Sequence, residues 1–308
     1  MTLQQLVYFL AVAETRHFTR AAHRAHVAQP SLSKQINSLE TELGASLFTR
    51  ARGNVALTAA GEALLPIAKR ILSDVDTARL EVAELVGLRR GRIRLGATPS
   101  VCVGVLADVL RRYHERYPGI RLQVEESGSR DLTAALLGGE LDLALLIVPP
   151  QGVESALTMT PVLREHLMVA SSSTAPALAD SVRLESLRDE PMVMFRRGYD
   201  LRETTLHACR EAGFEPALAV EGGEMDAVLR FVEAGLGVAL VPSLVLPGRP
   251  GLRATPLAGT TIRRTIALAH RTDTPPTAAA RAFRSTLFGH IDGLVAANAL
   301  PPGVEPLR

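Results

Sequence analysis

Cysteine is scarce in this 308-residue sequence, which contains only Cys102 and Cys209. Two cysteines in a chain of this length exclude a scaffold cross-linked by disulfides, and they fit a reducing compartment. Disorder is excluded as well, because 47% of the residues are apolar and only 21% are charged. The length predicts about two or three domains, with room for a sizeable core.

Long apolar runs are also missing, since none approaches the roughly 18 residues that cross a membrane. Residues 6–13 are apolar and contain an A-x-A pattern, but they lack the preceding basic stretch of a signal peptide. The apolar residues of this region have helical spacing instead: Leu3, Leu6, Val7, Leu10 and Ala13. We therefore expect an amphipathic core helix at the start of a soluble, cytoplasmic protein with no membrane partner.

The net charge of +2 gives little indication of a nucleic-acid partner when it is averaged over the chain. Residues 1–94, however, contain 13 Lys and Arg against 8 Asp and Glu, a net charge of +5. Residues 95–308 contain 21 against 24, a net charge of −3. A basic N-terminal part is the electrostatic pattern of a nucleic-acid contact, although an excess of this size also arises by chance.

Catalytic and cofactor motifs are absent. The sequence contains no G-x-S-x-G, no G-x-x-x-x-G-K-[ST] and no H-E-x-x-H. Gly235 and Gly237 lack the third glycine of a dinucleotide-binding loop, and they follow a predicted helix. We therefore expect that the protein is not an enzyme, and that it has no catalytic residues and no cofactor.

Histidine and cysteine offer no stronger signal. His17, His23 and His26 do not have the spacing of a zinc site, so we expect a helix surface near phosphates and no metal. Cys102 and Cys209 fall within predicted helices in different parts of the chain. Burial is their expected role, rather than a redox switch, because no neighbour in the sequence would lower the thiol pKa.

The first sixty residues predict three helices and a hairpin. Residues 18–25 form a short second helix with Thr19 as its N-cap. A tight break at residues 26–29 leads into a third helix that has Pro30 in its first turn and Gly44 at its end. Apolar residues at spacings of 4, 3 and 4 give this helix a buried face: Leu32, Ile36, Leu39 and Leu43.

The opposite face of the third helix is polar. It presents Gln29, Ser31, Ser33, Lys34, Gln35, Asn37 and Thr41. Short polar side chains with a single cation suit the base edges of a major groove. The alternative is an ordinary solvated face, but such faces are usually richer in Glu and Lys, and no acid precedes Glu40 here.

Residues 47–58 predict a β-hairpin around a turn at Gly53-Asn54. Arg50 and Arg52 alternate along one side of it. Arginines on a hairpin beside a helix-turn-helix suit phosphate contacts, which fix the register on DNA without reading its sequence. The alternative is a charged hairpin tip with no ligand.

Five segments carry a resemblance to a known family. They are FTRAA at residues 18–22, VAQPSLSKQI at 27–36, LETELG at 39–44, LFTR at 47–50 and LTAAG at 57–61. Together they resemble the winged helix-turn-helix of LysR-type transcriptional regulators over residues 3–61. The resemblance implies that the helix from Pro30 to Leu43 is the recognition helix, and that Gln29, Pro30, Ser33 and Lys34 occupy DNA-reading positions. With the residues above, the candidate DNA-binding set is Thr19, Gln29, Pro30, Ser31, Ser33, Lys34, Asn37, Arg50 and Arg52.

Residues 58–88 contain a heptad pattern, with apolar residues at alternating spacings of 4 and 3. The seam is Leu64, Ala68, Ile71, Val75, Ala78, Val82 and Leu85. A core helix of one globular domain is the alternative, and Pro66 is expected to kink the helix near its start. In the family that the chain resembles, this helix pairs two chains, and the paired heads contact the two halves of a dyad operator in double-stranded DNA.

Strands and helices alternate after the basic boundary at residues 89–92, which predicts a mostly parallel sheet with crossover helices. This α/β part resembles the two-lobed, periplasmic-binding-protein-like effector domain of LysR-type regulators, on segments 139–145 and 234–242. We expect a DNA-binding domain at 1–58, a linker and dimerisation helix at 59–89 and an effector domain at 90–308. Lobe I is expected at about 90–162 and 270–308, and lobe II at about 163–269.

In such folds ligands bind beyond the carboxyl ends of strands. The candidate effector-binding residues follow predicted strands: Thr98, Ser100, Ser129, Phe195, Arg196, Glu224 and Met225. Ser100 and Ser129 have a simpler alternative role as N-caps. The apolar strand end at residues 145–148, together with Arg196, favours an organic acid as the effector, with an aromatic one as an extrapolation.

These patterns predict a sequence-specific transcriptional regulator, dimeric and also tetrameric, whose oligomer shape and DNA contacts are controlled by a small-molecule effector bound between two lobes. A solute-binding protein of the same two-lobed fold is the alternative, but it requires export. An enzyme on the same lobes is a third candidate, for which the sequence offers no catalytic group.

Overall fold

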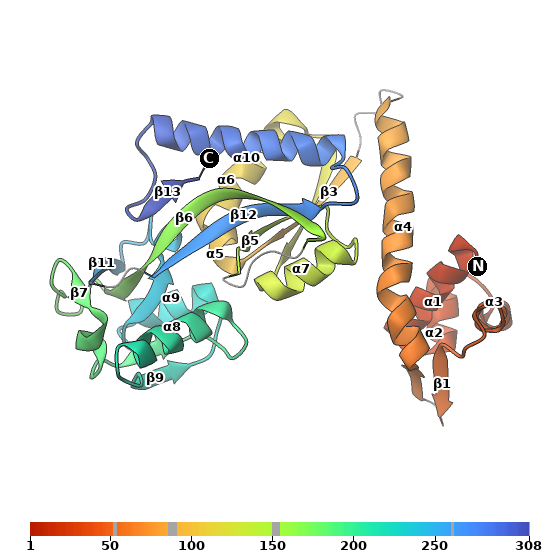
Figure 1. Ribbon diagram of the computed structural model, residues 1–308, viewed down its shortest axis with the longest axis horizontal. Coiled ribbons are helices and arrows are strands. Elements are labelled where there is room, and N and C mark those ends of the chain that lie inside the picture. Colours follow the sequence, from red (N-terminus) through yellow and green to blue (C-terminus); the bar gives the residue numbers. More distant parts are fainter. Residues whose placement is uncertain (52–53, 86–90, 150–154, 260–261, 308) are drawn as a thin grey trace. The chain divides into compact units, whose positions relative to one another are not determined.

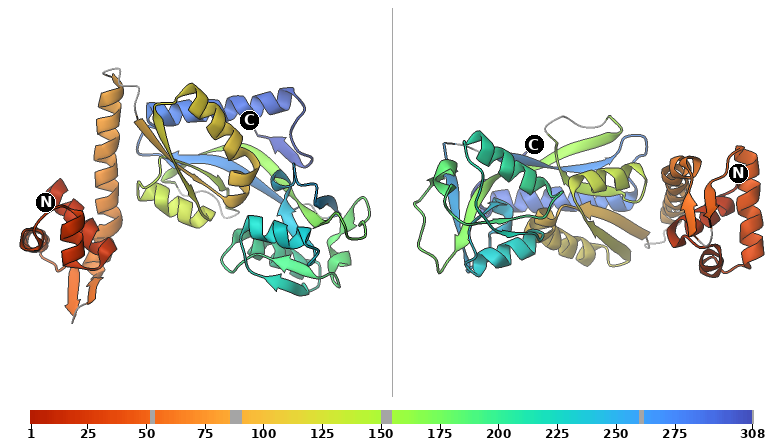
Figure 2. Two further views of the ribbon diagram at one scale, coloured as in Figure 1. Left: turned by 180° about the vertical axis from the view of Figure 1, so that it is seen from behind. Right: turned by 90° about the horizontal axis from the view of Figure 1, so that it is seen from below.

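The computed structural model describes residues 1–51, 54–85, 91–149, 155–259 and 262–307 (Figures 1 and 2). The main division of the chain into two compact units falls between helix α4 (Ala59–Leu85) and strand β3 (Gly91–Ala97). No helix in the described ranges is long and apolar enough to cross a membrane.

The N-terminal unit contains the three predicted helices and the hairpin, followed by the long helix. Its elements are α1 (Leu3–Thr15), α2 (Phe18–Arg24), α3 (Gln29–Leu43), β1 (Phe48–Ala51), β2 (Asn54–Leu57) and α4. Phe9, Leu32 and Ile36 are fully buried in its core. The Phe9 ring lies 5.4 Å from the ring of Phe48, so the hairpin shares the core of the helices.

Local capping explains where these helices begin and end. Pro30 lies in the first turn of α3, and Gly44 ends that helix with a φ of +69°, as predicted. The predicted cap of α2 is wrong. Its N-cap is His17, whose Nδ1 accepts a hydrogen bond from the backbone N–H of Thr19 at 3.2 Å. Thr19 therefore lies inside the first turn of α2, with its side chain exposed.

The buried face of α1 differs from the predicted one. Leu6, Phe9 and Val12, spaced by three residues, lie in the core. Val7 is 40% exposed because it lies on the opposite side of the helix from those three, and Leu3 is 43% exposed at the first residue of α1. The predicted burial of Leu43 is also wrong, since that side chain is 43% exposed at the last turn of α3.

Helix α4 contains 27 residues and remains helical through Pro66. Its predicted seam divides into two parts. Ala68 is fully buried against the head formed by α1–α3 and the hairpin, and Leu64 and Ile71 pack on the same core. Ala78 is exposed and Val82 is 61% exposed. The first half of the seam thus completes the core of its own unit, where α4 runs beside α1 and α2 (Figure 1), and Ala78 and Val82 of the second half are exposed.

The second unit is built on a nine-stranded sheet with the order β4–β3–β5–β12–β6–β11–β7, on which β10 and β13 also pair with β6. The strands are β3, β4 (Ile120–Glu126), β5 (Leu143–Ile147), β6 (Leu157–Ser172), β7 (Val182–Arg183), β10 (Ala239–Pro242), β11 (Leu252–Ala258), β12 (Arg263–Arg271) and β13 (Val304–Pro306). Strands β8 (Met192–Met194) and β9 (Leu218–Glu221) form a separate parallel pair.

Helices cover the strands of this unit. A continuous helical run contains α5 (Pro99–Val101), the π-helical turn η1 (Cys102–Leu106) and α6 (Ala107–Arg116). The others are α7 (Ser129–Leu137), η2 (Leu184–Leu187), α8 (Asp200–Glu211), α9 (Met225–Glu233), η3 (Ser243–Val245) and α10 (Ala278–Ala296).

Strands β6 and β12 join two lobes, each with its own core. The first half of β6 pairs with β12 and β13, and its second half pairs with β10 and β11, all antiparallel (Figure 1). Among the strands of the described residues, the parallel pairs are β3 with β4 and β5, β7 with β11, and β8 with β9. The expectation of a mostly parallel sheet is therefore wrong for the strands that join the lobes.

Gly237 gives a test of this packing, since a Cβ there would lie 2.2 Å from the carbonyl oxygen of Pro191, at a φ of +148°. We expect Gly237→Ala to lower the free energy of unfolding by about 3 kcal/mol, through steric overlap and backbone strain. Gly235→Ala is the matched control, because its φ is +81° with open space around the Cβ, and we expect a loss of about 1 kcal/mol. Equal losses in urea unfolding would contradict this packing.

Candidate DNA-binding and effector-binding sites

The outer face of α3 carries most of the predicted DNA-binding residues. Gln29, Pro30, Ser31, Lys34 and Asn37 are exposed, and Ser33 is partly exposed. The buried side of α3 places them outward, because its apolar residues anchor the helix in the core. The structure therefore leaves this polar row available to a ligand.

Glu40, the first acid of α3, is used within the protein. Its carboxylate accepts hydrogen bonds from the backbone N–H groups of Leu47 at 2.7 Å and Phe48 at 3.3 Å. Thr58 adds a second connection, because its hydroxyl donates to the carbonyl of Ser46 at 2.6 Å. These bonds fix the start of the hairpin against the end of α3.

The hairpin pairs as predicted, with Phe48 opposite Leu57 and Arg50 opposite Val55. Arg50 thus lies in β1. Arg52 and the predicted turn at Gly53 lie outside the described residues.

The lobe I candidates lie where neighbouring strands end. Thr98 and Ser100 follow β3 and are 5% and 0% exposed. Ser129 begins α7, and its Oγ accepts a hydrogen bond from the backbone N–H of Ile147 at the end of β5, at 3.1 Å. Because β4, β3 and β5 are parallel neighbours, their carboxyl ends meet at one edge of the sheet.

Arg264 and Glu165 are functional candidates that the sequence analysis missed. They are direct cross-strand partners on β12 and β6, and Arg264 Nε donates to Glu165 Oε1 at 2.7 Å. Arg264 Nη2 also donates to Ser100 Oγ at 2.5 Å. Each is a charged residue next to an apolar stretch of its strand, so the apolar pattern does not mark it, and pairing residues 99 positions apart requires the fold.

The lobe II candidates divide into buried and exposed pairs. Phe195 and Met225 are each 1% exposed, so their side chains belong to the core. Arg196 and Glu224 are brought together, with Arg196 Nε donating to Glu224 Oε1 at 2.7 Å and both side chains nearly half exposed. The charge of Arg196 is therefore matched by a carboxylate at the start of α9.

Tyr199 of lobe II lies close enough to charged residues of several elements to be affected by their charges. Its ring stacks on Phe195 with centroids 4.9 Å apart. Burial raises the pKa of Tyr199, the Arg264 guanidinium opposes that rise, and Glu224 and Glu126 add to it. Tyr199 of lobe II therefore lies within electrostatic reach of β12, of the end of β4 and of the start of α9.

The two thiols are held in their neutral form. Burial and the nearby Glu126 carboxylate raise the pKa of Cys102 to about 12. Burial, with a smaller contribution from Glu215, raises the pKa of Cys209 to about 11. Within the described ranges, no group of three or more His, Cys, Asp or Glu side chains could hold a metal ion.

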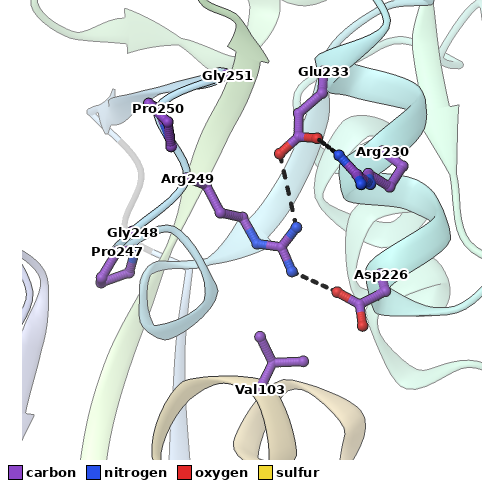
Figure 3. Close-up of a pocket in the computed structure, with 9 residues that line it drawn as sticks. All are labelled: Val103, Asp226, Arg230, Glu233, Pro247, Gly248, Arg249, Pro250 and Gly251. Atoms are coloured by element: carbon purple, nitrogen blue, oxygen red, sulfur yellow. Dashed lines mark hydrogen bonds and ion pairs between the residues drawn. The ribbon is translucent and has the colours of Figure 1, made fainter.

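A pocket of about 820 Å³ lies elsewhere in this unit, between α9, residues 247–251 and Val103 (Figure 3). Arg249 occupies it, with Nη2 at 2.5 Å from Asp226 and Nη1 at 3.7 Å from Glu233. Its lining includes none of the predicted effector residues.

A winged helix-turn-helix followed by a two-lobed α/β unit defines a ligand-responsive, DNA-binding class of regulator. Residues 3–62 match the model described as the bacterial regulatory helix-turn-helix protein of the lysR family, and residues 87–291 match the LysR substrate binding domain. The chain belongs to the LysR family of DNA-binding transcriptional regulators. The expected family, fold class and function are confirmed.

Relatives along the whole chain support this assignment. The chain is 30% identical to the DNA-binding transcriptional dual regulator OxyR of Escherichia coli over 300 residues, 95% of this chain and 98% of that protein. It is 36% identical over 280 residues, 88% of each chain, to a probable hydrogen peroxide-inducible genes activator of Streptomyces viridosporus. The relatives are regulators, so the alternative of a solute-binding protein is set aside.

Solved structures of full-length regulators are similar over the same span. A full-length OxyR variant from Pseudomonas aeruginosa has a TM-score of 0.73 at 28% identity, and the match covers 93% of this chain and 94% of that one. Full-length CbnR in complex with its target DNA has a TM-score of 0.69 at 25% identity, with 95% and 99% covered.

The raised thiol pKa values predict slow alkylation. At pH 7.5 less than about one thiol in a thousand is ionised when the pKa is 11 or above. We expect iodoacetamide to leave Cys102 and Cys209 unmodified in the native protein, by mass spectrometry, while both react in urea. Labelling should rise with pH toward 11, since deprotonation forms the reactive thiolate. Rapid labelling of either cysteine at pH 7.5 would contradict the assigned protonation states.

Proposed function

We propose that this regulator reads operator DNA with the outer face of α3 and contacts phosphates with the hairpin. The proposed DNA-binding residues are Thr19, Gln29, Pro30, Ser31, Ser33, Lys34, Asn37, Arg50 and Arg52. The observation that carries the proposal is the exposed polar row of α3, with a lysine and no acid before Glu40. Short donors and acceptors on a helix face match base edges in the major groove.

The proposed domain boundaries are residues 1–58 for DNA binding, 59–89 for the linker helix and 90–308 for the effector domain. The exposed seam residues Ala78 and Val82 support a homodimer, because exposed apolar residues at heptad spacing bury well against a second copy. A dimer presents two heads to a dyad operator. Tetramers are proposed as a further association of such dimers.

The effector is proposed to bind at the strand ends of the second unit. The residues are Thr98, Ser100, Ser129, Phe195, Arg196, Glu224 and Met225, of which Phe195 and Met225 could offer only backbone atoms because their side chains are buried. A small organic acid fits the buried hydroxyls of Thr98 and Ser100. Binding to one arrangement of the lobes in preference to another would shift the oligomer between shapes with different DNA contacts.

We propose neither an enzymatic activity nor a cysteine-based redox switch for this regulator. Regulators are generally not enzymes, and the curated relatives are regulators. Several relatives are named for hydrogen peroxide-inducible genes. In this chain both thiols are neutral at physiological pH, which disfavours attack on peroxide. Alkylation at pH 7.5 tests this point directly.

Lys34→Ala tests direct reading of DNA. We expect affinity for the DNA upstream of the protein's own gene to fall about tenfold or more in a mobility-shift assay, and the preference over a random duplex to shrink. Arg111→Ala, on an exposed face of α6 in the other unit, removes the same charge and should leave both affinities unchanged. An equal loss of affinity for the upstream DNA and for the random duplex would mean that Lys34 contacts phosphates and does not read bases.

Val82→Asp tests the linker seam. A carboxylate at this exposed seam position would be buried between two chains, so we expect dissociation to monomers at micromolar concentration in analytical ultracentrifugation. Arg79→Asp is the control, because Arg79 lies off the seam with its side chain 74% exposed. A Val82→Asp protein that stays dimeric would exclude this half of α4 from the interface.

A further inference from the structure

Arg264 is an enclosed cation that lies beside Ser100, one of the proposed effector residues. Its side chain is 11% exposed, and Glu165 beside it is fully buried. Glu165 uses both carboxylate oxygens, Oε1 on Arg264 Nε at 2.7 Å and Oε2 on the backbone N–H of Leu244 at 3.2 Å. The carboxylate is thereby held in place, and it holds the guanidinium in one orientation.

One nitrogen of that guanidinium, Nη1, makes no hydrogen bond within the described residues. Nε and Nη2 donate to Glu165 and Ser100, whereas Nη1 is not among the buried atoms that lack a partner. Nη1 therefore keeps access to the space outside the protein. Arginine binds carboxylates best with two parallel donors on a fixed plane, and this one is already oriented.

Two hydroxyl groups near Arg264 also lack partners. The Thr98 Oγ1 atom is buried and makes no hydrogen bond with the part of the chain that the structure describes. A buried hydroxyl without a hydrogen bond is energetically unfavourable, so a ligand that supplies one is favoured at this position. The Tyr199 hydroxyl makes none within the same ranges, and the charge of Arg264 reaches it electrostatically. A ligand with several acceptor oxygens would satisfy all three groups.

Arg196 is less suited to the same task. Its guanidinium is nearly half exposed and is paired with Glu224 at 2.7 Å. An anion placed there would be screened by water and repelled by Glu224.

We infer that Arg264, oriented by Glu165, is the cation that binds the effector, and that the effector presents a carboxylate to Arg264, Thr98 and Tyr199. This inference rests on the proposed effector-controlled function and deepens it. Arg264 becomes the residue that selects acids over their neutral analogues, and Glu165 is a positioning residue.

The test uses the full-length protein with acetate and benzoate as probes, each compared with its amide, at pH 7.5 and constant ionic strength. We expect at least one carboxylate to raise Tm by about 2 °C or more at 50 mM while its amide does not. Arg264→Gln should abolish the shift, and the control Arg111→Gln, on the exposed face of α6, should retain it. No shift with either acid, equal shifts with the amides, or a shift that survives Arg264→Gln would each overturn the inference.

Because Arg264→Gln leaves the Glu165 charge buried and unpaired, the double variant Glu165→Gln/Arg264→Gln protects the test against misfolding. It should fold with a native circular dichroism spectrum and still bind no carboxylate. DNA binding by the unliganded proteins separates the two claims. If the wild type binds no DNA, the proposed function fails. If it binds DNA while Arg264 is irrelevant to the carboxylate, only this inference fails.

Discussion

The antiparallel pairing of β6 with β12 is the constraint on which the second unit depends. Strand β6 is 16 residues long, and four strands pair with it: β10, β11, β12 and β13. Its register matters because a slip of one residue would turn every inward side chain outward. Glu165 and Arg264 face each other directly in this ladder. A buried ion pair contributes little net stability but strongly disfavours any register that separates its charges.

The same ion pair connects the two lobes chemically. Arg264 reaches Ser100 at the end of β3, and Glu165 reaches the backbone of Leu244 in η3. Leu244 lies in the core of lobe I, whereas its neighbour Val245 lies in the core of lobe II. A group that competes for any member of this network therefore changes bonds that both lobes share, which is the physical requirement for a ligand to bias their arrangement.

Local patterns predicted the local structure well and the long-range pairs poorly. Pro30 and Gly44 bound α3 as expected, because capping depends on neighbouring residues. The face of α1 was assigned wrongly because both sides of that helix carry apolar residues, and only packing selects between them. The apolar pattern does not mark the first half of β6, since Pro161, Arg164 and Glu165 interrupt it, and β11 contains Arg253 and Pro256. Arg264 could not be placed beside Ser100, which is 164 residues away in sequence.

Helix α4 has a dual role that constrains how a signal could reach DNA. Its first half is part of the core of the head, where Ala68 has no exposed surface. Close packing of that kind leaves no freedom for the head to turn on the helix without opening its core. If two chains pair through the exposed second half, each head follows its own α4 as one body. The spacing between two recognition helices is then set by the angle between paired α4 helices, and a change in that angle moves both heads without altering the DNA-reading surface.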